Sequence, residues 1–294
     1  MSPGGGGALR APKAPHVRLI DLLEGETMKR LASVLLGIVI LGITGLAGPL
    51  EMGFGAGPSF TSLNSFNESI DVYNTLIDHL NETFDIHPGV TGTVAAMPSL
   101  GTGLYLSASE QYRLTDWFAF GVQVEYAGSS SATTGFYQGS EISEIDLAFG
   151  SHLLGAILGG EVTFVDLGLR LGATGGVGYF YTILDRKAVF QIPAEFPDAI
   201  AGLPPEGEER YTGGAFGLEA GITLTYPIID WFTIGTRVTY RTAEVGSLKN
   251  SQGIELDLNG DGQSEPVSLS GLAVQFTFSI NIDLSLDGGK ESLQ

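Results

Sequence analysis

The chain has 294 residues, 43 of them glycine, no cysteine and a formal net charge of −19. The lack of cysteine excludes disulfides and thiol chemistry, and the excess of 33 acidic over 14 basic residues should repel the phosphates of nucleic acids. A mean hydropathy of +0.21 is too apolar for a disordered chain. Beyond residue 47, however, no apolar run of about 18 residues predicts a transmembrane helix.

The first 47 residues divide into two segments. Residues 1–27 contain four consecutive glycines and several prolines, and we interpret them as a segment upstream of the true start codon at Met28. Residues 28–47 combine Lys29-Arg30, an apolar run and a small-residue ending, which predicts a signal peptide cleaved after Ala47. A retained transmembrane anchor is the alternative, but the run is short for one.

An internal similarity marks the turns of the mature chain. Residues 115–126 align with residues 229–240, and each copy has an Asp-Trp-Phe sequence, at Asp116 and at Asp230. A looser copy begins near Asp166. Aspartate favours tight turns because its side chain can bond nearby backbone N–H groups. We therefore expect short hairpin turns at about 115–117, 165–167 and 229–231.

Long stretches around these turns alternate between apolar and polar residues, the period of a β-strand. After Asp116, for example, Phe118, Phe120 and Val122 share one face. Eight such strands are expected, near 49–59, 100–114, 117–128, 143–164, 167–184, 211–227, 231–245 and 268–286. The alternation in 143–164 is weakest around Gly155 to Gly160, which indicates a bulge or a misread turn.

The strand pattern favours a closed antiparallel transmembrane barrel over a soluble sandwich. The predicted strands exceed the usual 3–10 residues, short turns alternate with long polar loops, and the signal peptide directs the chain out of the cytosol. In lipid, a closed barrel satisfies its backbone polar groups and an open sheet does not. The fold expected for 48–286 is an all-β, eight-stranded barrel, followed by a tail at 287–294.

Four loops are expected on the side opposite the short turns. The first, 60–99, contains a short amphipathic helix, because Phe66, Ile70, Ile77, Leu80 and Phe84 recur at helical spacing. Ser65 and Glu68 suggest a capping box at its start. The remaining loops, 129–142, 185–210 and 246–267, are polar and in part acidic. Acidic loops solvate an outer face or attract cations to a pore mouth.

The inward face of the predicted barrel carries opposite charges. An eight-stranded barrel has room inside only for side chains, and an unpaired buried charge is costly. We therefore expect a structural ion network, with a narrow gated pore as the alternative. Its members are Glu51, Arg113, Glu125, Glu161, Arg170, Glu219, Arg237 and Arg241.

Two further sets of residues are candidates for specific roles. Asp257, Asn259 and Asp261 resemble the first half of an EF-hand calcium loop, with Glu265 as a further oxygen donor, although Ser268 stands where that loop needs a glutamate. These residues predict a candidate Ca²⁺ site, and no other cofactor is expected. An ordinary polar turn explains the motif equally well.

Trp117 and Trp231 follow the turn aspartates and are expected at the membrane interface. Ser151 and His152 are adjacent in a strand and should point to opposite faces, which argues against a Ser–His catalytic pair.

These features resemble the small outer-membrane barrels of the OmpA/OmpX/OmpW-like superfamily. The resemblance rests on the Asp-Trp-Phe units at 116–118 and 230–232, the alternating final strand and the signal peptide. It implies bacterial outer-membrane localisation, contact with outer-membrane lipid and assembly by the outer-membrane insertion machinery. The chain departs from the pattern because residues 287–294 follow the final strand.

The function expected from sequence is a structural or surface-interaction role, with no enzymatic activity and no identified extracellular partner. A narrow channel for small or hydrophobic solutes is the first alternative. A lipid-modifying outer-membrane enzyme is a more distant one.

Overall fold

The computed structural model describes residues 49–87, 89–139, 142–191, 206–257, 264 and 266–283. The chain divides into two compact units, Met1–Leu46 and Ala47–Gln294, and every described residue belongs to the second. The predicted upstream segment, signal peptide and C-terminal tail lie outside the described residues. None of the described helices is long and apolar enough to cross a membrane.

Eight antiparallel strands form a closed ring, as the sequence predicted. They are β1 (Pro49–Thr61), β3 (Thr102–Thr115), β4 (Phe118–Gln138), β5 (Ile142–Asp166), β6 (Arg170–Gln191), β7 (Gly207–Ile229), β8 (Phe232–Val245) and β10 (Gly271–Asp283). The ring closes because β10 pairs with both β1 and β8. Two short strands lie off the ring: β2 (Thr91–Val94) pairs with β4, and β9 (Val267–Ser268) pairs with β8.

Strand alternation gives the ring an apolar outer wall. Phe54 of β1 lies opposite Phe278 of β10, and their rings stack 5.4 Å apart on this outer face. Exposed apolar side chains on it include Leu106, Phe120, Leu158, Val177, Leu218, Ile222, Val238 and Phe276. A closed ring with an apolar exterior can stand in lipid, since all its strand backbones are paired.

Three short turns join strands at the end of the ring where β1 begins and β10 ends. Asp116–Trp117 separates β3 from β4, 167–169 separates β5 from β6, and Asp230–Trp231 separates β7 from β8. The first and third turns lie where they were predicted, and the second lies two residues later than the predicted 165–167. Because short turns are periplasmic in outer-membrane barrels, we name this end the periplasmic mouth.

The bulge predicted at Gly155 to Gly160 is wrong. There β5 pairs without interruption with both β4 and β6, and its register shift lies at Thr163/Val165 instead. Gly159 lies opposite Gly176, and Gly160 lies opposite Gly175. The alternation fades because glycines occupy both faces, not because the strand changes its register.

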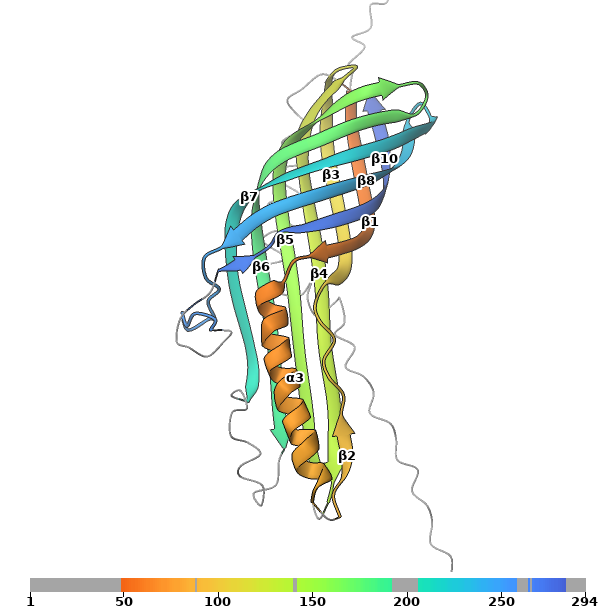
Figure 1. Ribbon diagram of the computed structural model, residues 1–294. Helices are drawn as coiled ribbons and strands as arrows, with labels where there is room; N and C mark the ends of the chain where they lie inside the picture. The colour runs from red at the N-terminus through yellow and green to blue at the C-terminus, as the bar shows by residue number, and fades with distance from the viewer. Residues whose placement is uncertain are drawn as a thin grey trace, which may run out of the picture. The chain divides into compact units, whose positions relative to one another are not determined.

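Four strands continue far beyond the ring. β4, β5, β6 and β7 have 21 to 25 residues, whereas β1, β3, β8 and β10 have 13 or 14. β4 loses its β3 neighbour after Gly128. The region beyond this point, which we call the extension, comprises 129–138, 142–151, 184–191 and 207–211 with β2 and the helix (Figure 1). Ten residues of strand span roughly 30 Å.

The extension overturns two predicted loops. Most of 129–142 and much of 185–210 are strand. The sequence predicts loops there because these segments are rich in Ser, Thr, Gly and charge. Such residues also suit a strand whose outer face stands in water rather than in lipid.

The helix α3 (Asn64–Asp85) runs along the extension (Figure 1). The predicted helix is confirmed, and with 22 residues it is longer than the short helix that the sequence indicated. Phe66, Ile70, Ile77, Leu80 and Phe84 are buried against the extended sheet. The predicted capping box is wrong, since Leu63 is the N-cap and no side chain caps it.

Candidate functional site

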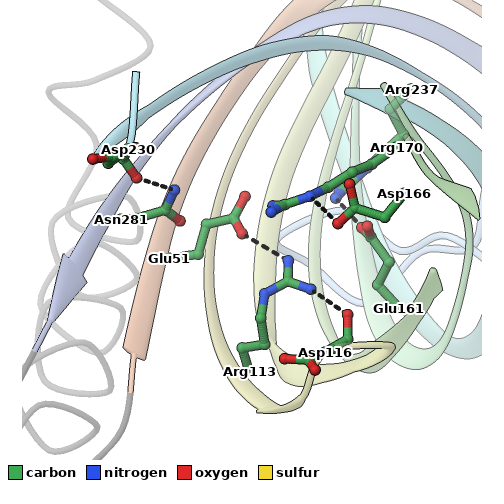
Figure 2. Close-up of polar contacts among 9 residues, drawn as sticks. All are labelled: Glu51, Arg113, Asp116, Glu161, Asp166, Arg170, Asp230, Arg237 and Asn281. Atoms are coloured by element: carbon green, nitrogen blue, oxygen red, sulfur yellow. Dashed lines mark hydrogen bonds and ion pairs between the residues drawn. The ribbon is translucent and has the colours of Figure 1, made fainter. Parts of the chain in front are cut away.

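The periplasmic mouth holds the first layer of lumen charges (Figure 2). Arg113 Nη2 donates to Glu51 Oε2 at 3.3 Å, and Arg113 Nη1 donates to the carbonyl of Asp116 at 3.4 Å. Arg170 Nε pairs with Asp166 Oδ2 at 3.0 Å. Arg170 thus joins a turn aspartate rather than a lumen glutamate, a pairing that sequence reasoning did not identify.

The second layer lies deeper and is almost fully buried. Arg241 donates to Glu125, and Tyr105 donates to the other oxygen of Glu125 at 2.5 Å. Arg241 Nε donates to the carbonyl of Leu269 at 2.9 Å, and its guanidinium lies 5.3 Å from the Phe180 ring centre. The Nε and Nη1 donors and the flat face of the guanidinium therefore help to fix Arg241 in place.

A neutral side chain connects the two layers. Gln123 accepts a hydrogen bond from Arg237 Nη1, and its Nε2 lies 3.2 Å from both Tyr105 Oη and Glu219 Oε1. Arg237 Nη2 also lies 3.8 Å from Glu161 Oε2. Gln123 and Tyr105 were not among the predicted network residues, although Gln123 lies on the same face of β4 as Glu125 and Tyr105 occupies an inward position of β3.

The lumen cavities between these side chains are small. One of about 30 Å³ lies beside Glu219 and Arg237, another of about 30 Å³ lies at the periplasmic mouth beside Glu51 and Arg113, and one of about 10 Å³ lies near Leu63. A cavity needs about 10–15 Å³ to hold a single water molecule. The cavities have room for water molecules and not for a solute.

Three asparagines of α3 bind the segment that follows the helix. Asn67 pairs with the backbone N and O of Leu100, both at 2.7 Å. Asn74 pairs with Met97 at 2.7 and 3.1 Å. Asn81 pairs with Val94, both at 3.0 Å. We call this set, Asn67, Asn74 and Asn81 with Val94, Met97 and Leu100, the asparagine ladder.

The ladder depends on a match of lengths. Seven helical residues advance about 10.5 Å, and three residues of extended chain advance about 9–10 Å. The segment 94–100 is also held from β4, where Ser131 donates to the carbonyl of Pro98 and Thr133 donates to that of Ala95 at 2.6 Å. The return segment is therefore fixed from both sides.

A polar cluster lies between α3 and the sheet. Arg186 pairs with Glu209 at 2.5 Å, Tyr211 donates to Glu209 at 2.7 Å, and Arg186 donates to Tyr73 Oη at 3.5 Å. Burial raises the pKa of Tyr73. Burial, and then the hydrogen bond to Glu209, raise the pKa of Tyr211 to about 12. Both tyrosines are therefore neutral hydrogen-bonding groups at physiological pH.

The outer face of the extension is polar. Lys187 pairs with Asp146 at 2.7 Å, and Arg210 pairs with both oxygens of Asp185 at 2.6 and 3.2 Å. The hydrogen bond to Asp146 raises the pKa of Lys187, so this lysine stays charged. Paired surface charges suit water and not hydrocarbon, so this face of the extension is suited to solvent.

The other candidate residues are placed as follows. Trp117 and Trp231 are 58% and 56% exposed beside the short turns, where interfacial aromatics are expected. Ser151 is buried, whereas His152 contacts Tyr126 Oη at 2.9 Å on the outer face.

The proposed calcium ligands Asn259, Asp261 and Glu265 lie outside the described residues, although Asp257 is described. Within the described residues, no group of three or more His, Cys, Asp or Glu side chains could hold a metal.

Comparison with known proteins gives no family by sequence: no protein-family model and no curated protein matches the chain. Among solved structures, it is similar to the outer membrane protein OprG from Pseudomonas aeruginosa, with 12% identity and a TM-score of 0.39, over 80% of this chain and 96% of that one. It is also similar to Neisserial surface protein A, with 10% identity and a TM-score of 0.37, over 81% and 99%.

A major outer membrane protein from Thermus thermophilus shows 10% identity and a TM-score of 0.38, over 79% and 99% of the two chains. Likenesses this low leave the function to the geometry of the chain itself.

Proposed function

We propose that this protein is a bacterial outer-membrane barrel with a structural and surface-interaction role, which holds the extension outside the cell as a rigid surface. Export through a cleaved signal peptide, contact with outer-membrane lipid and assembly by the insertion machinery belong to the same proposal. The apolar outer wall, the three short turns and the polar outer face of the extension support this placement.

One observation carries the proposal. A single buried apolar cluster runs from Phe84 in the extension, through Leu63 and Leu100, to Phe180 and Ile157 in the barrel. The same packing that makes the extension rigid therefore also fills the outer end of the lumen. A display role needs such packing, whereas a conducting pore is obstructed by it.

Conductance in planar bilayers tests the closed lumen. We expect no reproducible single-channel steps from the purified full chain. Steps whose size changes in Arg237→Ala would overturn the closed lumen and favour the alternative of a narrow channel. A variant with the same charge change at the exposed Arg210, Arg210→Ala, controls for a loss of positive charge outside the lumen.

Cysteine labelling tests the placement of the extension, because the natural chain has no cysteine. Val72→Cys lies on α3 at a residue that is 55% exposed, and Trp117→Cys lies at a short turn at a residue that is 58% exposed. A membrane-impermeant maleimide should label Val72→Cys on intact cells and Trp117→Cys only after permeabilisation. The reverse pattern would contradict the proposed orientation.

A further inference from the structure

The deep lumen has one carboxyl group more than its guanidinium groups can neutralise. Among the described lumen residues beyond the Arg113–Glu51 pair, Arg241 pairs with Glu125 and Arg237 lies 3.8 Å from Glu161. No basic side chain of the described residues lies within 4 Å of Glu219, which is only 7% exposed. A buried carboxylate without a counter-ion is costly, so the site favours a bound cation.

The space beside Glu219 is shaped for a small guest. Glu219, Thr174 and Arg237 line the same cavity of about 30 Å³. Glu219 Oε2, Thr174 Oγ1 and Arg237 Nε are buried and have no hydrogen-bond partner among the protein atoms. Buried polar atoms are normally satisfied, and this volume has room for about two water-sized guests.

The chemistry of the lining restricts the guest further. Divalent cations are held by sites with several oxygen ligands or by carboxylates with room for bound waters. The described part of the chain has no group of three His, Cys, Asp or Glu side chains that could hold a metal, and the cavity beside Glu219 has room for only about two waters. The guanidinium of Arg237 borders the same cavity and would repel a highly charged ion. A single positive charge is what the surplus carboxyl group of Glu219 requires.

Access to the cavity is one-sided. Arg237 also lines the second cavity, which includes Glu51 and Arg113, and the side chains of both are 21% exposed at the periplasmic mouth (Figure 2). In the opposite direction, Tyr105 and Phe180 are 1% and 0% exposed and belong to the buried apolar cluster. We therefore expect water and small ions to reach Glu219 from the periplasmic mouth.

We propose that the lumen cavity beside Glu219 binds one small monovalent cation, a proton or an alkali ion, which enters from the periplasmic mouth. A proton on Glu219 with water in the cavity suits the neighbouring Arg237 better than an alkali ion does. The inference stands independently of the proposed surface role, because a barrel without any surface partner would have the same surplus carboxyl group.

Infrared spectroscopy of the purified full chain at pH 7 in choline chloride tests the proton. We expect a carboxylic-acid C=O band that is lost in Glu219→Gln and kept in the matched control Glu161→Gln. An alkali ion would instead raise the unfolding midpoint of the natural protein when Na⁺ or K⁺ replaces choline.

A band that persists in Glu219→Gln would overturn the assignment to Glu219. The whole proposal is overturned if the natural protein has neither the carboxylic-acid band nor an unfolding midpoint that depends on alkali ions. This result needs no variant, so it holds even where a variant fails to fold.

The direction of entry has its own test. Thr174→Cys places a single thiol in the cavity, which has room for Ag⁺, a thiol-binding monovalent cation. In vesicles that hold the protein in one orientation, Ag⁺ should bind this thiol, and so block its reaction with a maleimide after unfolding, only when it is added on the side of the periplasmic mouth. Ag⁺ added on the other side should bind the control Val72→Cys. Equal binding to Thr174→Cys from both sides would overturn entry from the periplasmic mouth.

Discussion

Replacing Asn74 by alanine removes the middle rung of the asparagine ladder. Asn74 accepts from Met97 N at 2.7 Å and donates to Met97 O at 3.1 Å, both partly buried. Leaving a buried backbone group unsatisfied costs about 1–3 kcal/mol. Two such groups, each taken at about 1–2 kcal/mol because both are only partly buried, less roughly 0.6 kcal/mol from the better helix propensity of alanine, predict a loss of about 1.5–3.5 kcal/mol in local stability of the extension.

Hydrogen exchange at the Met97 amide measures this loss directly. At about 1.4 kcal/mol per tenfold change, the expected acceleration is roughly 10- to 300-fold. Thr75→Ala is the matched control, since Thr75 is exposed and bonds only within the helix, to the carbonyl of Asp71. Asn74→Asp keeps the acceptor but turns an oxygen toward the Met97 carbonyl, so it should also destabilise. Unchanged exchange in Asn74→Ala would refute the ladder as a stabilising element.

Three further outcomes are expected. Arg241→Met leaves the buried Glu125 without its partner and should lower the free energy of unfolding by about 3–5 kcal/mol. The double variant with Glu125→Gln should restore most of this loss. If the losses of the two single variants simply add in the double variant, the two residues do not act as a pair. Burial raises the pKa of Tyr137, in the extension, to about 12 from 10.0, so its stabilising contribution is complete below pH 10 and lost as the pH rises through 12. Near-ultraviolet circular dichroism should follow that loss, and a Tyr137→Phe variant with the same pH dependence would assign it elsewhere. Phe276→Arg should lower the free energy of unfolding in a bilayer by about 2–4 kcal/mol. Phe136→Arg should change it by no more than about 0.5 kcal/mol. These residues are 76% and 53% exposed, so equal costs would contradict the assignment of one to lipid and the other to water.

Strands in the ring were predictable because lipid and lumen impose different chemistry on alternate residues. Phe118, Phe120 and Val122 therefore revealed their strand directly. In the extension this contrast fails, because 129–138 is rich in Ser, Thr and Gly on both faces. A polar strand and a polar loop have the same composition, and only the pairing with β5 distinguishes them.

The sequence indicated which residues face the lumen but not which of them contact each other. Alternation placed Glu125 and Arg241 inside, yet strands far apart in sequence decide which charges meet. Arg170 was expected to join the lumen network and instead pairs with Asp166, four residues before it across the turn. Gln123 was overlooked because it is uncharged, although it lies between the two layers.

The asparagine ladder also limits how the lengths of its two partners can change. Successive rungs are seven residues apart in α3 and three residues apart in the segment 94–100. Inserting one residue in either partner would put every later rung out of step, whereas adding seven to the helix and three to the segment would add a complete rung. The extension is thus a modular part, which can grow or shrink only by paired units of two different sizes.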